Sequence, residues 1–276
     1  MKPFAVLISA LLFAAGTHAA NALGAAALRS QYASMATRLA TSELGGPLVL
    51  QSEDAGRRID GEVFGVVEHP FETVASALAE QSAWCEILIL HQNTKSCRRT
   101  TDARGTTLEI RVGKKGPQAP EQASLLAFRW VAATKRPDYV AIRMEADEGP
   151  YDTRDYRLFT EAVPLDGGRT FVHMGYAFSS SGAGSLAMGL YLATVARGKI
   201  GFTHEGDKYV GGVRGIAERN TLRYFLAIDA FLSQSQPEKR IAQWYDATER
   251  YPRQLHELER DEYLKMKREE LKRPQK

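Results

Sequence analysis

The sequence predicts an α+β fold in which a curved antiparallel sheet wraps around a long C-terminal helix. Three observations support this prediction. Apolar and polar side chains alternate between residues 96 and 181, which is the period of strands. A helical period with a wide apolar face returns over residues 213–232. Residues 61–81 run from a strand-like segment through Pro70 into a helix-like one.

The alternating region divides into at least five strand-like segments separated by turn residues. The segments cover residues 108–112, 126–130, 140–144, 156–163 and 170–179. Glycine, proline and aspartate mark turns at 115–117, 136–138, 148–150 and 166–168. Because such short connections join antiparallel neighbours, we expect one sheet with an apolar face. The last two segments form the clearest hairpin.

Helices are expected at both ends of this sheet region. Residues 25–41 place Leu28, Tyr32, Met35 and Leu39 on one stripe, and a short strand is expected at 48–51. A short helix is expected at 186–195, before the long one. The long helix is apolar over most of its circumference, so it should be buried on more than one side.

Beyond Pro237 the chain becomes densely charged. A helix is expected at 239–250, followed by a charged stretch over 254–273 with a thin apolar stripe. Two interpretations remain open for this stretch. It is either a solvated helix packed along the surface, or a contact surface for a partner or for another copy of the chain.

The first residues have the three regions of a secretory signal peptide. Lys2 precedes an apolar run at 4–15, which is shorter than the ~20 residues that span a bilayer. Small residues precede two possible cleavage points, after Ala19 and after Ala22. A buried N-terminal helix is the alternative. We therefore expect an exported mature chain without a transmembrane segment, periplasmic if the source is Gram-negative.

The two cysteines fit an exported protein. An oxidising compartment favours a Cys85–Cys97 disulfide, and two separate buried thiols are the alternative. A straight strand would hold these residues ~40 Å apart, whereas bonded cysteines have Cα atoms ~5.5 Å apart. The chain would therefore have to fold back, most simply near residues 91–94.

Composition and motifs exclude several classes of function. A net charge of +3 is too small to indicate a nucleic-acid partner. The histidines lack metal-ligand spacing, so no metal site is expected. Residues 182–187 match a glycine-rich dinucleotide pattern, but that motif needs a parallel βαβ unit, and a strand-to-helix turn explains the glycines. No cofactor and no catalytic motif are expected.

The order of elements resembles the START-like (SRPBCC) superfamily with its helix-grip fold. The matching segments are GEVFGVVEHPF, the following helix ending at Trp84, and VRGIAERNTLRYFLAIDAFL. The resemblance covers about residues 55–235 and implies a hydrophobic cavity between the sheet and the last helix. We accordingly divide the chain into a signal peptide (1–22), a helical extension (23–52), a START-like domain (53–235) and a helical appendage (236–276).

Seven residues are candidate ligand contacts in such a cavity, each with a structural alternative. They are Trp84, Trp130, Arg143, His173, Tyr176, Tyr224 and Asp229. The tryptophans could equally be core residues. His173 and Arg143 could instead lie on the convex, solvent-facing side of the sheet, and Asp229 could pair with an arginine.

Three hypotheses of function follow from these features. The first is an exported, non-catalytic binding protein that holds a hydrophobic or lipid-like ligand. The second is a cavity-based enzyme of the cyclase or hydrolase type, for which His173, Glu161, Arg143 and Asp229 are the available acid–base groups. The third is a scaffold acting through its terminal helices. Deleting residues 237–276 would separate a binder, which should keep its ligand, from a scaffold. The oligomeric state does not follow from the sequence.

Overall fold

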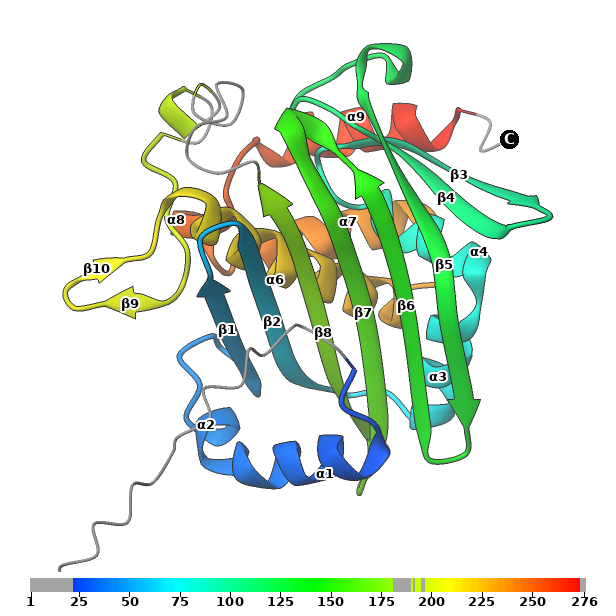
Figure 1. Cartoon of the computed structure of the whole chain (residues 1–276), viewed down its shortest axis with the longest axis vertical. Helices are drawn as coiled ribbons and strands as arrows, with labels where there is room; N and C mark the ends of the chain where they lie inside the picture. The colour runs from blue at the N-terminus through cyan, green and yellow to red at the C-terminus, as the bar shows by residue number, and fades with distance from the viewer. Residues whose placement is uncertain (1–21, 181–189, 191, 195–196, 274–276) are drawn as a thin grey trace, which may run out of the picture.

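A computed structural model describes residues 22–180, 190, 192–194 and 197–273. One antiparallel sheet has the order β1-β2-β8-β7-β6-β5-β4-β3 (Figure 1). Its strands are β1 Leu48–Asp54, β2 Arg58–Val67, β3 Thr94–Asp102, β4 Gly105–Val112, β5 Ser124–Arg136, β6 Tyr139–Glu148, β7 Thr153–Leu165 and β8 Arg169–Ser180. A short hairpin, β9 His204–Glu205 with β10 Lys208–Tyr209, precedes the long helix.

The long helix α6, Gly212–Ser233, packs against β2, β1 and β8, and lies behind the sheet in Figure 1. The helices α3, Phe71–Ala79, and α4, Gln81–Leu88, pack on β6 and on β3. The main apolar core lies between these helices and the inner face of the sheet. The predicted helix-grip arrangement is therefore confirmed.

The N-terminal helices cover the opposite, outer face of the sheet. The predicted helix over 25–41 is divided at Met35 into α1, Ala25–Ser34, and α2, Ala36–Ala40. The predicted apolar stripe is buried in a second cluster with Phe64 and Phe171. Successive strand residues point to opposite faces, so Val63 contacts the main core while Phe64 contacts this outer cluster.

The C-terminal helices join the main core. They are α7 Pro237–Thr248, α8 Pro252–Leu255 and α9 Arg260–Leu271. Of the two interpretations left open for residues 254–273, α9 has the packing of a helix that lies along the domain, since it contacts α7, but it is buried more deeply than a solvated surface helix, because Tyr263 and Met266 join the main core. It also buries the charged side chains of Lys267 and Glu270.

The predicted disulfide between Cys85 and Cys97 is confirmed, with Cα atoms 5.2 Å apart. Cys85 lies in α4 and Cys97 in β3, and the chain reverses between them at residues 89–93. Closing this loop stabilises the folded chain by about 3 kcal/mol in the chain-entropy model.

The glycine-rich turn at 182–187 lies outside the described residues, as does most of the helix expected at 186–195. Over the residues that the structure does describe, no helix combines the length and apolarity needed to cross a membrane.

Candidate functional site

A cavity of about 130 Å³ lies between α6 and the inner face of the sheet, which we call the grip cavity. Its apolar wall is aromatic: Tyr156 comes from β7, Tyr176 and Phe178 from β8, and Tyr224 from α6. Alternation along β8 places residues 176 and 178 on the same face. The helix crosses that face and brings Tyr224 against them.

The aromatic rings contact one another closely. Ring centroids lie 5.5 Å apart for Tyr176 and Tyr224, and 5.6 Å apart for Tyr156 and Phe178. Burial raises the pKa of Tyr156 to about 12, and it raises the pKa values of Tyr176 and Tyr224 as well. The hydroxyl groups therefore stay protonated at neutral pH and provide hydrogen-bonding groups in an otherwise apolar wall.

Basic side chains gather at one end of the grip cavity around a single carboxylate. Glu257 accepts from Lys115 Nζ at 2.6 Å and from Arg223 Nη2 at 3.2 Å, and lies 2.9 Å from Lys199 Nζ. Burial acts to raise the pKa of Glu257, but Arg223 and the lysines outweigh it and hold that pKa below its usual value. Arg219 also lines the cavity, and its Nη1 donates to the carbonyl of Ile200 at 3.0 Å.

Among the described residues that line the grip cavity, Glu257 is the only acidic one against four basic ones. The lining therefore has an excess of positive charge next to an aromatic wall. Such a site complements a molecule with an apolar body and an anionic group.

His91 forms part of the wall in its neutral form. Its ring centroid is 5.2 Å from that of Tyr224, and its Nε2 is 3.3 Å from Asn220 Oδ1. Burial, together with the positive charge of Arg223 and of two lysines, places the pKa of His91 well below its usual value. The neutral ring adds no charge to the cavity, and its other nitrogen, Nδ1, accepts from the backbone nitrogen of Asn93 at 3.2 Å.

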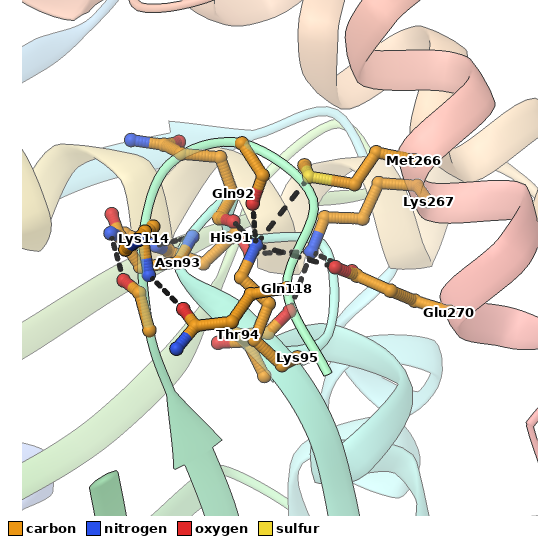
Figure 2. A network of polar contacts seen from close by, with 12 residues as sticks. His91, Gln92, Asn93, Thr94, Lys95, Lys114, Gln118, Met266, Lys267 and Glu270 are labelled. Atoms are coloured by element: carbon orange, nitrogen blue, oxygen red, sulfur yellow. Dashed lines mark hydrogen bonds and ion pairs between the residues drawn. The ribbon is translucent and has the colours of Figure 1, made fainter. Parts of the chain in front are cut away.

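The loop that presents His91 is held by a buried polar network from α9 (Figure 2). Lys267 Nζ donates at 2.7 Å to the carbonyls of His91 and Thr94, and to Glu270 Oε2. Lys95 Nζ donates to the Gln92 carbonyl at 2.8 Å and to Glu270 Oε1 at 3.3 Å. The C-terminal appendage thus positions one wall of the grip cavity.

A larger cavity of about 420 Å³ lies beside the Cys85–Cys97 disulfide and does not share its lining residues with the grip cavity. Ile89, Leu90 and Leu271 give it an apolar lining, and an ion pair between Arg240 and Glu86 lies at its edge. We call it the disulfide cavity. Its lining comes from α4 and β3 on one side, and from the start of α7 and the end of α9 on the other.

The structure places two of the seven candidate contacts together. Tyr176 and Tyr224 line the grip cavity. Trp84 lies in the core, where its Nε1 donates to the Leu78 carbonyl at 2.9 Å. Trp130 is partly buried and packs against the same core.

The three charged candidates lie away from the grip cavity. Arg143 is exposed on β6, with its Nε 3.4 Å from Glu145. Asp229 lies near the C-terminal end of α6, 3.6 Å from His69 Nε2, so its partner is a histidine and not the expected arginine. His173 lies on the outer face, but beneath the N-terminal segment and not in solvent, stacked on Phe64 with centroids 4.0 Å apart.

Sequence reasoning missed the polar side of the grip cavity. Ile216, Arg219, Asn220, Arg223 and Tyr224 line it from one face of α6. Their spacing of three and four residues is the signal that could have identified this face. Lys115, Lys199 and Glu257 come from separate loops, and no periodicity links them.

No protein-family model and no curated protein matches the sequence. Among solved structures, a START superfamily protein from Mycobacterium smegmatis is 14% identical, with a TM-score of 0.39 over 66% of this chain and all of that one (100%). The Zhui aromatase/cyclase from Streptomyces sp. R1128 is 12% identical, with a TM-score of 0.34 over 68% of this chain and 94% of that one. Ara h 8.0201 is 12% identical, with a TM-score of 0.40 over 64% and 98%.

The helix-grip architecture that the sequence predicts is present in the structure itself. The curved sheet, the paired helices α3 and α4 and the gripping helix α6 are present in the expected order. Similarity at these scores does not say what this chain binds, so any ligand has to be inferred from its own cavities.

Proposed function

We propose that this chain is an exported binding protein that holds a small amphipathic anion in the grip cavity, without chemical conversion. The supporting observation is the pairing of an aromatic wall with an excess of basic side chains in one cavity. The apolar body would lie against Tyr176, Tyr224 and Phe178. The anionic group would face Arg219 and the lysines around Glu257.

The size of the cavity limits the ligand. At about 130 Å³ the grip cavity is smaller than the ~300–1,000 Å³ usual for drug-sized ligands. A short carboxylate or a small aromatic acid suits this volume, whereas a complete lipid does not. Burial of the apolar body contributes ~25 cal/mol per Å², and the charged end fixes orientation.

The four acid–base groups that the sequence offered for catalysis lie outside the grip cavity, which favours the binding hypothesis over the enzyme hypothesis built on them. His173 and Glu161 lie on the outer face of the sheet, beneath the N-terminal segment. Arg143 is exposed, and Asp229 lies near the end of α6 beside His69. General acid–base catalysis needs groups within hydrogen-bonding reach of one substrate, and these four groups do not converge on the grip cavity.

Calorimetric titration with short straight-chain carboxylates and the alcohols of equal length tests this proposal. We expect the carboxylates to bind more tightly than the alcohols, and added salt to reduce the difference. Lys199→Met should weaken carboxylate binding several-fold and leave alcohol binding unchanged. Arg143→Met is the matched control, because it removes an exposed charge from the outer face. Equal affinity for acid and alcohol, or binding of neither, would overturn the proposal.

Export is tested separately by cell fractionation. We expect the full chain in the periplasm or medium, and a chain lacking residues 1–22 in the cytoplasm. Cytoplasmic retention of the full chain would contradict export without affecting the ligand proposal.

A further inference from the structure

Four donors converge on one buried carboxylate at the start of the described chain. Glu161 Oε1 accepts from the backbone nitrogen of Leu23 at 2.7 Å and lies 2.8 Å from His173 Nδ1. Glu161 Oε2 accepts from the backbone nitrogen of Gly24 at 3.0 Å and from the Tyr139 hydroxyl at 2.7 Å. The side chain of Glu161 is fully buried, so this set of donors replaces its water shell.

Leu23, which makes one of these contacts, directly follows a possible leader cleavage site. Ala20, Asn21 and Ala22 place small residues at the −3 and −1 positions of a leader cleavage site. Leu23 is the first residue after that site. Ala22 and Leu23 are both exposed, while the backbone nitrogen of Leu23 points to Glu161.

Two carboxylates flank one imidazole in this cluster, since Glu62 Oε2 lies 3.6 Å from His173 Nε2 and Glu161 Oε1 lies 2.8 Å from His173 Nδ1. The arginines of this region, Arg29 and Arg136, both pair with the exposed Asp138, at 3.0 and 3.7 Å. A cation at the backbone nitrogen of Leu23 would instead contact the buried carboxylate of Glu161 directly.

We propose that the leader is cleaved between Ala22 and Leu23, and that the new α-ammonium of Leu23 docks on Glu161. A leader peptidase would hydrolyse the peptide bond with one water: Ala22 gains the hydroxyl, the nitrogen of Leu23 gains a hydrogen, and the carboxyl proton passes to the amine. The contact between a neutral amide and the carboxylate then becomes one between two opposite charges, and the Coulomb attraction between them is added to the hydrogen bond. This inference rests on the export proposed above.

The consequence is a processing-dependent anchor for the N-terminal helices. Removing the leader creates the ammonium that pins the start of α1 to the outer face of the sheet, where Glu161 and His173 lie. The precursor has only amide donors at the same place. The processed chain should therefore be the more stable form, with α1 and α2 held over the outer cluster.

The first experiment is the intact mass of the full chain after export. We expect a mature chain that begins at Leu23. A chain that begins at Ala20 would overturn the inference and leave export intact. An uncleaved exported chain would also overturn the inference, whereas a chain that stays in the cytoplasm on fractionation would overturn the export on which it rests.

The second experiment measures the pKa of the α-amino group by nitrogen-15 NMR, in mature chains labelled at leucine. An ordinary α-amino group has a pKa of ~7.7–8.0. We expect a value at least one unit higher at Leu23, a return to the ordinary range in Glu161→Gln, and no change in the control Glu145→Gln. An ordinary value in the wild-type chain would overturn the docking.

A third measurement does not require the Glu161→Gln variant to fold. Acetylation of the α-amino group removes the charge and keeps the amide donor. We expect the acetylated mature chain to have a lower melting temperature than the free-amine chain at neutral pH. The two should converge above the measured α-amino pKa, where the free amine is also neutral. Equal melting temperatures at neutral pH would overturn the inference.

Discussion

The buried network around Glu270 allows a quantitative prediction for Glu270→Gln. Its carboxylate lies 2.7 Å from Lys267 Nζ and 3.3 Å from Lys95 Nζ, and both lysine side chains are 0% exposed. Removing the carboxylate leaves two buried ammonium groups with only carbonyl and thioether partners. Breaking a buried ion pair on one side costs about 3–5 kcal/mol.

Neutralisation sets the lower end of the expected loss. A buried lysine that loses its partner can release its proton instead, and the pKa of Lys267 in the folded chain is already lowered to about 8. Releasing that proton at pH 7 costs about 1.4 kcal/mol, whereas two ammonium groups that stay charged without their carboxylate cost about 3–5 kcal/mol. We therefore expect Glu270→Gln to reduce the free energy of unfolding by about 1.5–5 kcal/mol, out of the ~5–15 kcal/mol that holds a typical domain folded.

Urea denaturation at neutral pH measures this change, with Glu269→Gln as the matched control. Glu269 is exposed and pairs with the exposed Lys272 at 2.8 Å, so its loss should change stability by less than about 0.5 kcal/mol. A loss below about 1 kcal/mol in Glu270→Gln, at an unchanged denaturant slope, would refute the reasoning.

The same variant should show a pH signature. Burial, opposed by Glu270, lowers the pKa of Lys267 to about 8. Since the folded-state pKa lies below the unfolded one, the unfolded chain binds more protons between these values, and stability rises with pH there. Without Glu270 the folded-state pKa falls further. The difference in stability between the variant and the wild type should therefore shrink as the pH rises from neutral to about 8, and above that both should gain stability in parallel up to the unfolded-state pKa of ~10.4.

Three further predictions concern other parts of the molecule. Replacing Cys85 and Cys97 together by serine should cost about 3 kcal/mol in urea denaturation, and a reductant should then have no further effect; an equal effect of reductant on variant and wild type would contradict this. His173→Gln should cost more stability at about pH 5.5 than at about pH 8.5. Burial lowers the pKa of His173, but two neighbouring carboxylates outweigh it and raise that pKa overall. The stabilisation is therefore complete below the unfolded-state value of ~6.5 and is lost as the pH rises through the folded-state value; a cost independent of pH would be contrary evidence. Tyr224→Ala should enlarge the grip cavity and shift the calorimetric preference to longer carboxylates, and an unchanged preference would place the ligand elsewhere.

Much of the fold could be predicted because its elements have a clear period. The alternation along the strands and the wide apolar face of α6 both reflect burial on one or more sides. The strand β3 was missed, because its sequence TKSCRRTTD is polar and the strand lies at the edge of the sheet. The break at Met35 was also missed, since the apolar stripe continues through it.

The sequence predicts a residue of the candidate site where the period of its strand or helix places that residue on the face towards the cavity. Tyr176 and Tyr224 follow from the strand and helix periods, and both line the grip cavity. The strand period also separates His173 from Tyr176, but it does not reveal that the N-terminal helix covers His173. The dense charge of α9 suggested a solvated helix, but two of its charged side chains are buried. Lys267 Nζ donates both to Glu270 and to the carbonyl of His91, which is far away in the sequence.

The position of α9 changes how a binder and a scaffold can be told apart. Deleting residues 237–276 would remove Trp244, whose Nε1 donates to the Arg223 carbonyl at 3.0 Å, together with Tyr263 from the main core. It would also release the loop that presents His91 to the grip cavity. A binder would then lose its ligand as readily as a scaffold would lose its partner. Point changes such as Lys199→Met leave that core intact, so loss of ligand there would reflect the cavity itself.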